Sequence, residues 1–247
     1  MNTACKNLLS TLAAAALMFG PLYAQEESSS LLTVRVVKIL PGKSGEFESL
    51  QKELSQATKE AGGSPRYIWQ EARGETSTYH VVSMEANFAE FDEGAEPPMS
   101  EAAWARWVSR ITDTIDTRNV VTYRMHPELE IPSDEGYEAQ YLLLLHRVVA
   151  PGRHAEYEEW LGNELVPYLK KSGVKGWSVG RLALGGDTNQ WTLARYVDSW
   201  SHFDETGPLA ELSEEDRNAM LALPREVNRG SQNLVLRFRG DLSYSGN

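Results

Sequence analysis

The sequence contains one stretch twice: residues 41–48 read PGKSGEFE, and residues 151–158, which lie 110 positions further on, read PGRHAEYE. The match continues between residues 79–93 and residues 191–205, which share a closing Phe-Asp-Glu at an offset of 112. Short loop insertions produce such a small drift in the offset. A period of this length predicts two domain-sized halves and not the short units of a solenoid.

Each half predicts the same order of elements: strand, helix, strand, strand, helix, strand. The hydrophobic periodicity and the Gly and Pro residues that interrupt it set the boundaries. In the first half the elements are residues 32–40, 45–61, 66–73, 78–86, 100–117 and 120–125. In the second half they are residues 141–149, 154–171, 176–184, 191–197, 213–228 and 234–239. This order is that of a ferredoxin-like unit, present twice.

A single ferredoxin-like sheet has helices on one face and leaves its other face uncovered, so two such sheets in one chain can cover each other. We therefore expect an α+β fold in which two tandem ferredoxin-like β-α-β-β-α-β repeats pack sheet to sheet as an intramolecular α+β barrel. The predicted organisation is a signal peptide over residues 1–24, a linker over 25–31, a first repeat over 32–126, a linker over 127–139, a second repeat over 140–242 and a tail over 243–247.

The first 24 residues differ in composition from the rest of the chain. Lys6 lies in a short polar start, residues 8–19 are apolar, and the segment ends in a small residue, Ala24. This pattern is typical of a secretory signal peptide, because a bilayer span needs roughly 20 apolar residues. We expect an exported protein, periplasmic or secreted, with no integral membrane span after cleavage. The single cysteine, Cys5, lies in this leader, so we expect no disulfide in the mature protein.

Composition and motifs argue against several classes of function. The formal net charge is −11 and the pI is near 5.0, which argues against binding to a phosphate backbone, and we expect no nucleic-acid partner. No H-E-x-x-H, Walker or G-x-G-x-x-G motif occurs, so zinc hydrolases, nucleotide triphosphatases and dinucleotide oxidoreductases have little support, and we expect no metal site.

Three features together resemble a known family. They are the repeated PGxxxEFExL-like motif, the helix end at residues 165–173, and the aromatic pattern of Trp191, Tyr196, Trp200 and Phe203. The chain resembles the dimeric α+β barrel superfamily over residues 32–242, in a tandem-fused form in which one chain supplies both halves. It is most similar to the NIPSNAP, EthD-like and antibiotic-biosynthesis monooxygenase branches. These motifs are architectural, so they specify the fold better than the function.

Strand alternation suggests candidate basic residues for a site between the sheets. We expect the apolar residues of the last strands, such as Tyr123 and Leu236, to meet the helices, which leaves Arg124 and Arg237 facing the space between the sheets as candidate catalytic residues. A buried guanidinium needs an anion, either a ligand or a protein carboxylate. A local salt bridge or exposure to solvent stays the alternative for both residues, and also for Arg195, a candidate ligand-binding residue.

Among the histidines, His146 is the most informative because it lies in the apolar run of residues 142–149, where its ring needs a hydrogen-bond partner. It is a candidate general base or axial haem ligand, and a purely structural histidine is the alternative. Its duplicate position is Val36, so such a site would be asymmetric. His80 is a weaker candidate.

Aromatic residues on the predicted strands, Trp69, Trp177 and Trp191, are candidate ligand-binding residues that could line a pocket for a flat molecule.

Two functions stay open. One is an exported small-molecule-binding protein of unassigned activity, with its ligand between the two sheets. The other, which the resemblance implies, is a cofactor-independent monooxygenase-like enzyme, or a haem-linked one, that acts on a small aromatic compound. We expect no resident cofactor, with haem as the alternative; a small-molecule ligand is the expected partner, and a homodimer stays open.

Overall fold

The computed structural model describes residues 31–94, 96–134, 137, 139–204, 213, 214, 218 and 226–246. The leader expected over residues 1–24 and most of the helix expected over residues 213–228 lie outside the described residues. Within the described part of the chain, no helix has the length and apolar character needed to cross a membrane.

The first half follows the predicted order of elements. It consists of β1 (Leu31–Ile39), α1 (Ser44–Glu60), β2 (Tyr67–Glu71), β3 (Thr78–Glu85), the short α2 (Glu90–Glu93), α3 (Glu101–Thr112) and β4 (Ile115–Met125). The last helix is shorter than predicted, because Ile115 already pairs with Ile39 of β1 and therefore belongs to the sheet.

The second half repeats this order among the described residues. It contains β5 (Tyr141–Val149), α4 (His154–Trp160), η2 (Leu161–Leu165), α5 (Val166–Lys171), β6 (Trp177–Leu184), β7 (Gln190–Val197), the short 3₁₀ turn η3 (Trp200–Phe203) and β8 (Asn228–Phe238), and the 3₁₀ turn η1 (Pro127–Leu129) precedes it. The sequence predicts one helix over residues 154–171, whereas the structure has a π-helical turn, η2, in its middle. Pro167 follows directly and cannot donate a backbone hydrogen bond, and a local change of helical pitch accommodates the missing donor.

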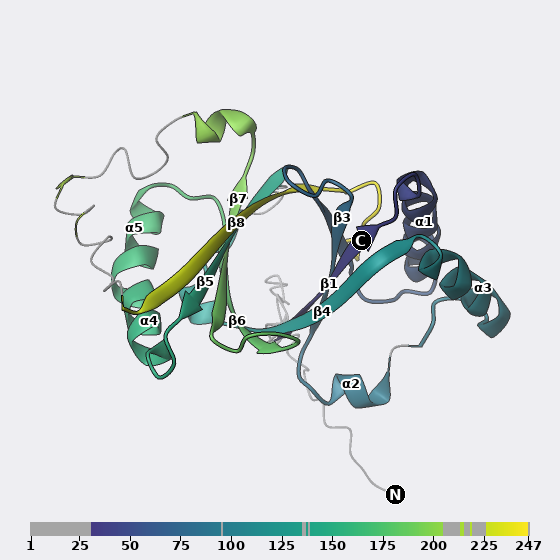
Figure 1. Cartoon of the computed structure of the whole chain (residues 1–247), viewed down its shortest axis with the longest axis horizontal. Coiled ribbons are helices and arrows are strands. Elements are labelled where there is room, and N and C mark those ends of the chain that lie inside the picture. The colour runs from purple at the N-terminus through teal and green to yellow at the C-terminus, as the bar shows by residue number, and fades with distance from the viewer. Residues whose placement is uncertain are drawn as a thin grey trace, which may run out of the picture.

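All eight strands form one closed barrel in the order β1-β3-β2-β8-β5-β7-β6-β4, with every pairing antiparallel. Within each half the order is that of a ferredoxin-like sheet. The halves join edge to edge, through β2 with β8 and β4 with β6, so closure removes the free sheet edges. The α+β class is confirmed. Figure 1 shows α1 and α3 on one side of the barrel and α4 and α5 on the opposite side.

Two apolar cores lie between the barrel wall and the helices. Phe47, Leu50 and Leu54 of α1 pack on β1 and β3 in the first half, and Tyr157 and Leu161 pack on β6 and β7 in the second. Further apolar residues of the strands cluster on the inner face of the barrel and are described below. Each strand is therefore apolar on both faces over much of its length, a pattern that leaves the direction of alternation ambiguous in the sequence.

Candidate functional site

The inner wall of the barrel, here called the lumen, carries two clusters of strand residues that contact no helix. One contains Val34, Val121, Tyr123 and Leu182, and the other contains Leu142, Leu144 and Leu236. Several apolar residues at their edges are only partly buried, namely Leu32, Val36, Val82, Met125, Trp69, Ala194, Tyr196 and Leu234. The inner wall is therefore mainly apolar, and part of its apolar surface stays accessible to water.

His146 lies two residues after Leu144 on β5, so its side chain is on the same lumen face of the strand. On the neighbouring strand β7 it pairs with Thr192. Its Nδ1 lies 2.8 Å from Thr192 Oγ1 and 3.2 Å from Gln190 Nε2. The amide nitrogen of Gln190 can only donate, so Nδ1 is the acceptor and the ring proton lies on Nε2. Burial is the main cause, with the neighbouring His80 second, of a decrease in the pKa of His146 to about 4. The ring is therefore neutral at pH 7 and offers an N–H donor at Nε2.

A second imidazole, His80 of β3, lies in the lumen opposite a carboxylate. It pairs with Val36 of β1 on one side and Trp69 of β2 on the other. His80 Nε2 lies 3.4 Å from Glu71 Oε1, and the two side chains are only 6% and 11% exposed. The pair therefore places an imidazole nitrogen and a carboxylate oxygen side by side within the lumen.

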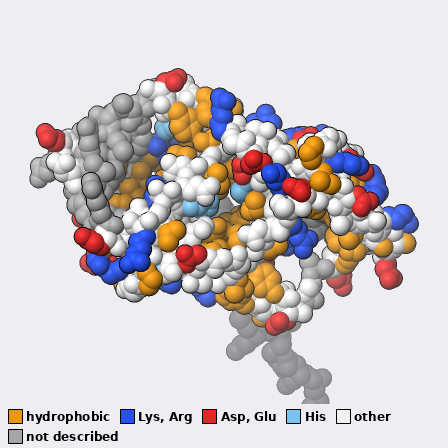
Figure 2. All heavy atoms as spheres, viewed as in Figure 1, with side chains coloured by type: hydrophobic (Ala, Val, Ile, Leu, Met, Phe, Trp, Pro, Cys, Tyr) orange, Lys and Arg blue, Asp and Glu red, His pale blue; other side chains and the backbone are white. Residues whose placement is uncertain are grey.

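Tyr123 completes a polar chain on the inner wall. Gln190 Nε2 donates to its hydroxyl at 3.3 Å as well as to His146, so Gln190 links the two side chains. Burial raises the pKa of the Tyr123 hydroxyl, which keeps it protonated. In the view of Figure 2, histidine side chains are visible from outside near the centre of the barrel. The arrangement combines a proton acceptor with neutral hydrogen-bond donors on the same inner wall.

The placement predicted for Arg124 and Arg237 is wrong. Arg124 is exposed on the outer face, with its guanidinium 5.5 Å from the ring centre of Phe88, and Arg237 donates to Gln70 Oε1 on the outer surface at 3.0 Å. Their apolar neighbours, including Tyr123, fill the inner clusters instead of meeting helices. The reason is closure: the inside of a barrel is itself an apolar layer, and it takes those positions.

Two of the three tryptophans, and Arg195, also lie away from the lumen. Trp177 and Trp191 are 2% and 0% exposed, within the core under α4 and α5, and do not form a pocket wall. Arg195 lies two residues after Leu193 of that core, so its side chain is on the outer face of β7. Burial lowers the pKa of its guanidinium. The structure places Trp69 in the lumen, with its ring centre 5.0 Å from that of Phe238. His146 and Trp69 are therefore the predicted site residues that the lumen brings together.

Sequence reasoning missed Glu71, Tyr123, Gln190 and Thr192. A signal for one of them was present, because Thr192 is the duplicate position of His80 at the offset of 112.

Residues 176–180 read GWSVG, the G-x-S-x-G pattern of a hydrolase nucleophile elbow. Ser178 lies inside β6 and pairs with Ala194, whereas an elbow needs a turn from strand to helix, so this pattern carries no nucleophile here.

Haem, the cofactor left open by the sequence, fits the lumen poorly. Its propionate carboxylates would need cationic partners if buried there. Among the lumen-facing residues of the described strands, Lys38 is the one Lys or Arg, and it already pairs with Glu75 at 2.9 Å. In addition, a metal bound at His146 Nε2 would require the proton on Nδ1, which accepts from Gln190. The residues of the lumen therefore do not fit haem.

The closed antiparallel barrel with outer helices defines a ferredoxin-like α+β barrel protein, whose mainly apolar lumen also carries two histidines. No family model matches the chain, and no curated protein matches its sequence. Solved structures are similar in fold. A candidate monooxygenase from Lactobacillus acidophilus is 8% identical with a TM-score of 0.61, and the match covers 88% of this chain and 96% of that one.

Two further solved structures support the same fold. An anthrone oxidase-like protein is 16% identical with a TM-score of 0.61, and the match covers 90% of this chain and 95% of that one. A mutant chlorite dismutase from Candidatus Nitrospira defluvii is 9% identical with a TM-score of 0.53, covering 87% and 93%. At these identities the similarity shows the fold that the chains share, and the chemistry has to be argued from the site.

Proposed function

We propose that the barrel lumen binds a small aromatic compound with an acidic C–H or O–H group, and that the His80–Glu71 pair removes its proton. The observation that carries this proposal is the presence of two imidazoles with different partners on one inner wall. His80 faces a carboxylate at 3.4 Å, whereas burial keeps His146 neutral. An imidazole beside a carboxylate is the common arrangement of a general base, and a neutral imidazole can donate a hydrogen bond to the anion that forms.

The geometry supplies each part of such a step. Trp69 and Phe238 offer flat apolar surfaces for an aromatic ring in the lumen. His80 accepts the substrate proton and the adjacent Glu71 stabilises the resulting imidazolium. The Nε2–H of His146 can donate to the oxyanion that forms on the substrate, and a preorganised donor in a partly dry site is effective there.

The reaction class that follows is oxidation of a deprotonated aromatic ketone or phenol by dissolved O2. The electron pair of the broken C–H bond stays on the substrate as an enolate, which O2 then oxidises. One oxygen atom enters the product as a carbonyl and the other leaves in water, so a CH2 group becomes C=O. The similarity in fold to an anthrone oxidase-like protein supports testing this class first.

Three finer points belong to the same proposal. We infer that the chain is a tandem fusion of two ferredoxin-like units, supported by the same strand order in each half. Its place nearest to the NIPSNAP, EthD-like and antibiotic-biosynthesis monooxygenase branches stays a prediction. So does export, which rests on the leader expected over residues 1–24.

Anthrone, a tricyclic ketone with an acidic CH2 group, is the probe for the experiment. We expect the protein to accelerate O2 uptake and formation of anthraquinone above the rate in buffer. Glu71→Gln and His80→Gln should each lower this rate by about 100-fold or more, as loss of a general base does. Glu60→Gln is the matched control, because Glu60 is exposed at the end of α1, outside the barrel. Turnover that survives both lumen variants would refute the proposed base.

Binding is measured separately from turnover. Quenching of tryptophan fluorescence by anthrone should be reduced in Trp69→Phe, since Trp69 is in the lumen while Trp177 and Trp191 are enclosed in the outer core. Saturable binding that Trp69→Phe reduces, without acceleration of O2 uptake, would identify a binding protein and reject the oxidation of this substrate. Absence of both would overturn the proposal for aromatic ketones.

A further inference from the structure

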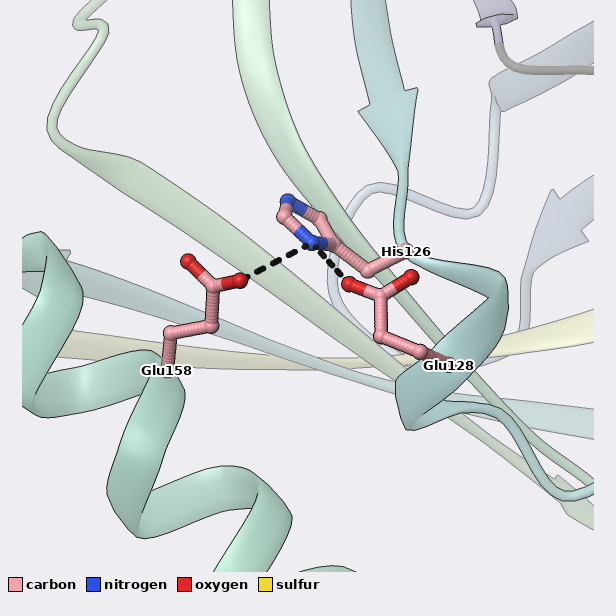
Figure 3. A group of neighbouring side chains, drawn as sticks. All are labelled: His126, Glu128 and Glu158. Carbon is pink, nitrogen blue, oxygen red and sulfur yellow. Dashed lines mark hydrogen bonds and ion pairs between the residues drawn. The ribbon is translucent and has the colours of Figure 1, made fainter.

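Three potential ligand groups converge on the outside of the barrel, away from the lumen. His126 follows the end of β4, Glu128 lies in η1, and Glu158 lies on α4. Figure 3 shows the two carboxylates reaching the same side of the imidazole from different elements. His126 Nδ1 is 2.8 Å from Glu128 Oε1 and 3.8 Å from Glu158 Oε1, and the three ligand atoms lie within 4.8 Å of one another.

The imidazole of this cluster is held in place by its surroundings. The backbone N–H of His126 donates to Val179 O at 3.0 Å, which fixes the chain beside β6. The ring lies 4.9 Å from the ring centre of the fully buried Trp191, and the His126 side chain is only 15% exposed. A ring positioned this way loses little conformational freedom when it binds a ligand.

The two carboxylates lack a strong positive partner. Among the residues that the structure describes, neither Glu128 nor Glu158 forms an ion pair with a lysine or arginine, and His126 is the one group that both contact. A cation at the cluster would offset the charge of these two carboxylates.

We propose that His126, Glu128 and Glu158 form a binding site for a divalent transition-metal ion of the zinc type. One imidazole nitrogen with two carboxylate oxygens suits Zn²⁺ or Co²⁺ better than Mg²⁺ or Ca²⁺, which prefer oxygen ligands. Glu128 and Glu158 are 59% and 44% exposed, so an ion can enter from solvent and keep water as its remaining ligand. The site is independent of the proposed lumen chemistry, because Tyr123 and His126 lie on opposite faces of β4 and its extension.

The test is a titration of the whole protein, freed of metal with a chelator, first with Zn²⁺ by calorimetry and then with Co²⁺ by visible absorbance. We expect one equivalent of Zn²⁺ to bind, and d–d bands of low-coordinate Co²⁺ to saturate at the same ratio. Co²⁺ should also quench tryptophan fluorescence, because His126 stacks near Trp191. Binding should weaken as the pH falls, since protons compete with the metal for all three groups.

Two variants decide the assignment. Glu158→Gln and His126→Gln should each weaken Zn²⁺ binding at least 10-fold, and His126→Gln should also remove the Co²⁺-dependent quenching. Glu159→Gln is the matched control, because it removes the same charge from the same helix at an exposed position and should change the affinity less than 2-fold. Circular dichroism confirms that each variant is folded. A wild-type affinity weaker than millimolar, or equal binding by the Glu158→Gln and Glu159→Gln variants, would overturn the proposal.

Discussion

Lowering the pH from about 7 to about 4 should reduce the stability of the protein through His146, and His146→Asn should remove that part of the pH dependence. Burial of the ring is the main cause that lowers its pKa from 6.5 to about 4 in the folded chain, with His80 and Arg147 adding smaller contributions. Asparagine keeps an acceptor near the position of Nδ1, so the bonds from Thr192 and Gln190 can survive the substitution.

The sign follows from proton uptake. In the unfolded chain an ordinary histidine takes up its proton near pH 6.5, whereas the folded ring does so only near pH 4. Between these values the unfolded state binds more protons, so the free energy of unfolding falls as the pH is lowered through this window. The two pKa values differ by about 2.5, and a difference of one pKa unit corresponds to about 1.4 kcal/mol. The free energy of unfolding should therefore fall by about 3 kcal/mol by about pH 4.

Urea unfolding of the wild type and of His146→Asn at several pH values between about 7 and about 4 measures this loss. The other titrating groups are shared by both proteins, so the difference between the two curves reports His146 together with its coupling to His80. The wild type should lose about 3 kcal/mol more than the variant over this range. Nitrogen NMR of the imidazole tests the same structure directly, because it should show the proton on Nε2 at neutral pH. Parallel stability curves, a proton on Nδ1, or titration near pH 6.5 would refute the assignment.

Three further predictions concern the fold. Trp191→Ala should cost about 3–5 kcal/mol in urea unfolding, because the ring is 0% exposed, whereas Trp200→Ala, at 37% exposed, should cost about 1 kcal/mol or less. Gly185→Ala should lower the thermal midpoint, because Gly185 has φ +92° and an added Cβ would meet the carbonyl of Val120. Gly45→Ala should instead stabilise the protein by about 0.5–1 kcal/mol, since Gly45 lies in α1 with nothing near its Cβ position.

The architecture was accessible from the sequence because each half satisfies local rules twice. The motif at residues 41–48 places a turn and a helix start directly after a β-branched strand, and the copy at residues 151–158 does the same. Within the helix predicted over residues 45–61, Phe47 and Leu50 recur at helical spacing, and both are buried against β1 and β3. Duplication of a short-range pattern therefore carried the long-range prediction that two sheets come together.

The orientation of the strands was not accessible in the same way. A strand covered on both faces has no polar side to fix its alternation, and β4 shows the consequence: Val121 and Tyr123 line the lumen, while Arg124 is exposed outside. The first strand reads Leu-Leu-Thr-Val-Arg-Val-Val-Lys-Ile, which is apolar at both odd and even positions. Shifting the alternation by one residue exchanges every inward and outward side chain. The wrong alternation assumed for the last strands therefore placed Arg124 and Arg237 inside the barrel.

The asymmetry predicted for His146 takes a more specific form in the barrel. In the first half Val36 of β1 pairs with His80 of β3, and at the matching rung of the second half His146 of β5 pairs with Thr192 of β7. Each half thus supplies one histidine to the lumen from the same rung, but from different strands. Because the strands differ, the two rings meet different neighbours: a carboxylate for His80, and a hydroxyl and an amide for His146.

Such polar groups are a burden for stability, because apolar side chains at the same positions would need no partners. The bonding of the two rings is also unequal. Here His80 is held by one contact of 3.4 Å, while Nε2 of His146 carries a proton toward the lumen. A pair of imidazoles that differ in this way is what transfer of a proton from a bound molecule requires, with one ring to accept it and the other to stabilise the anion left behind.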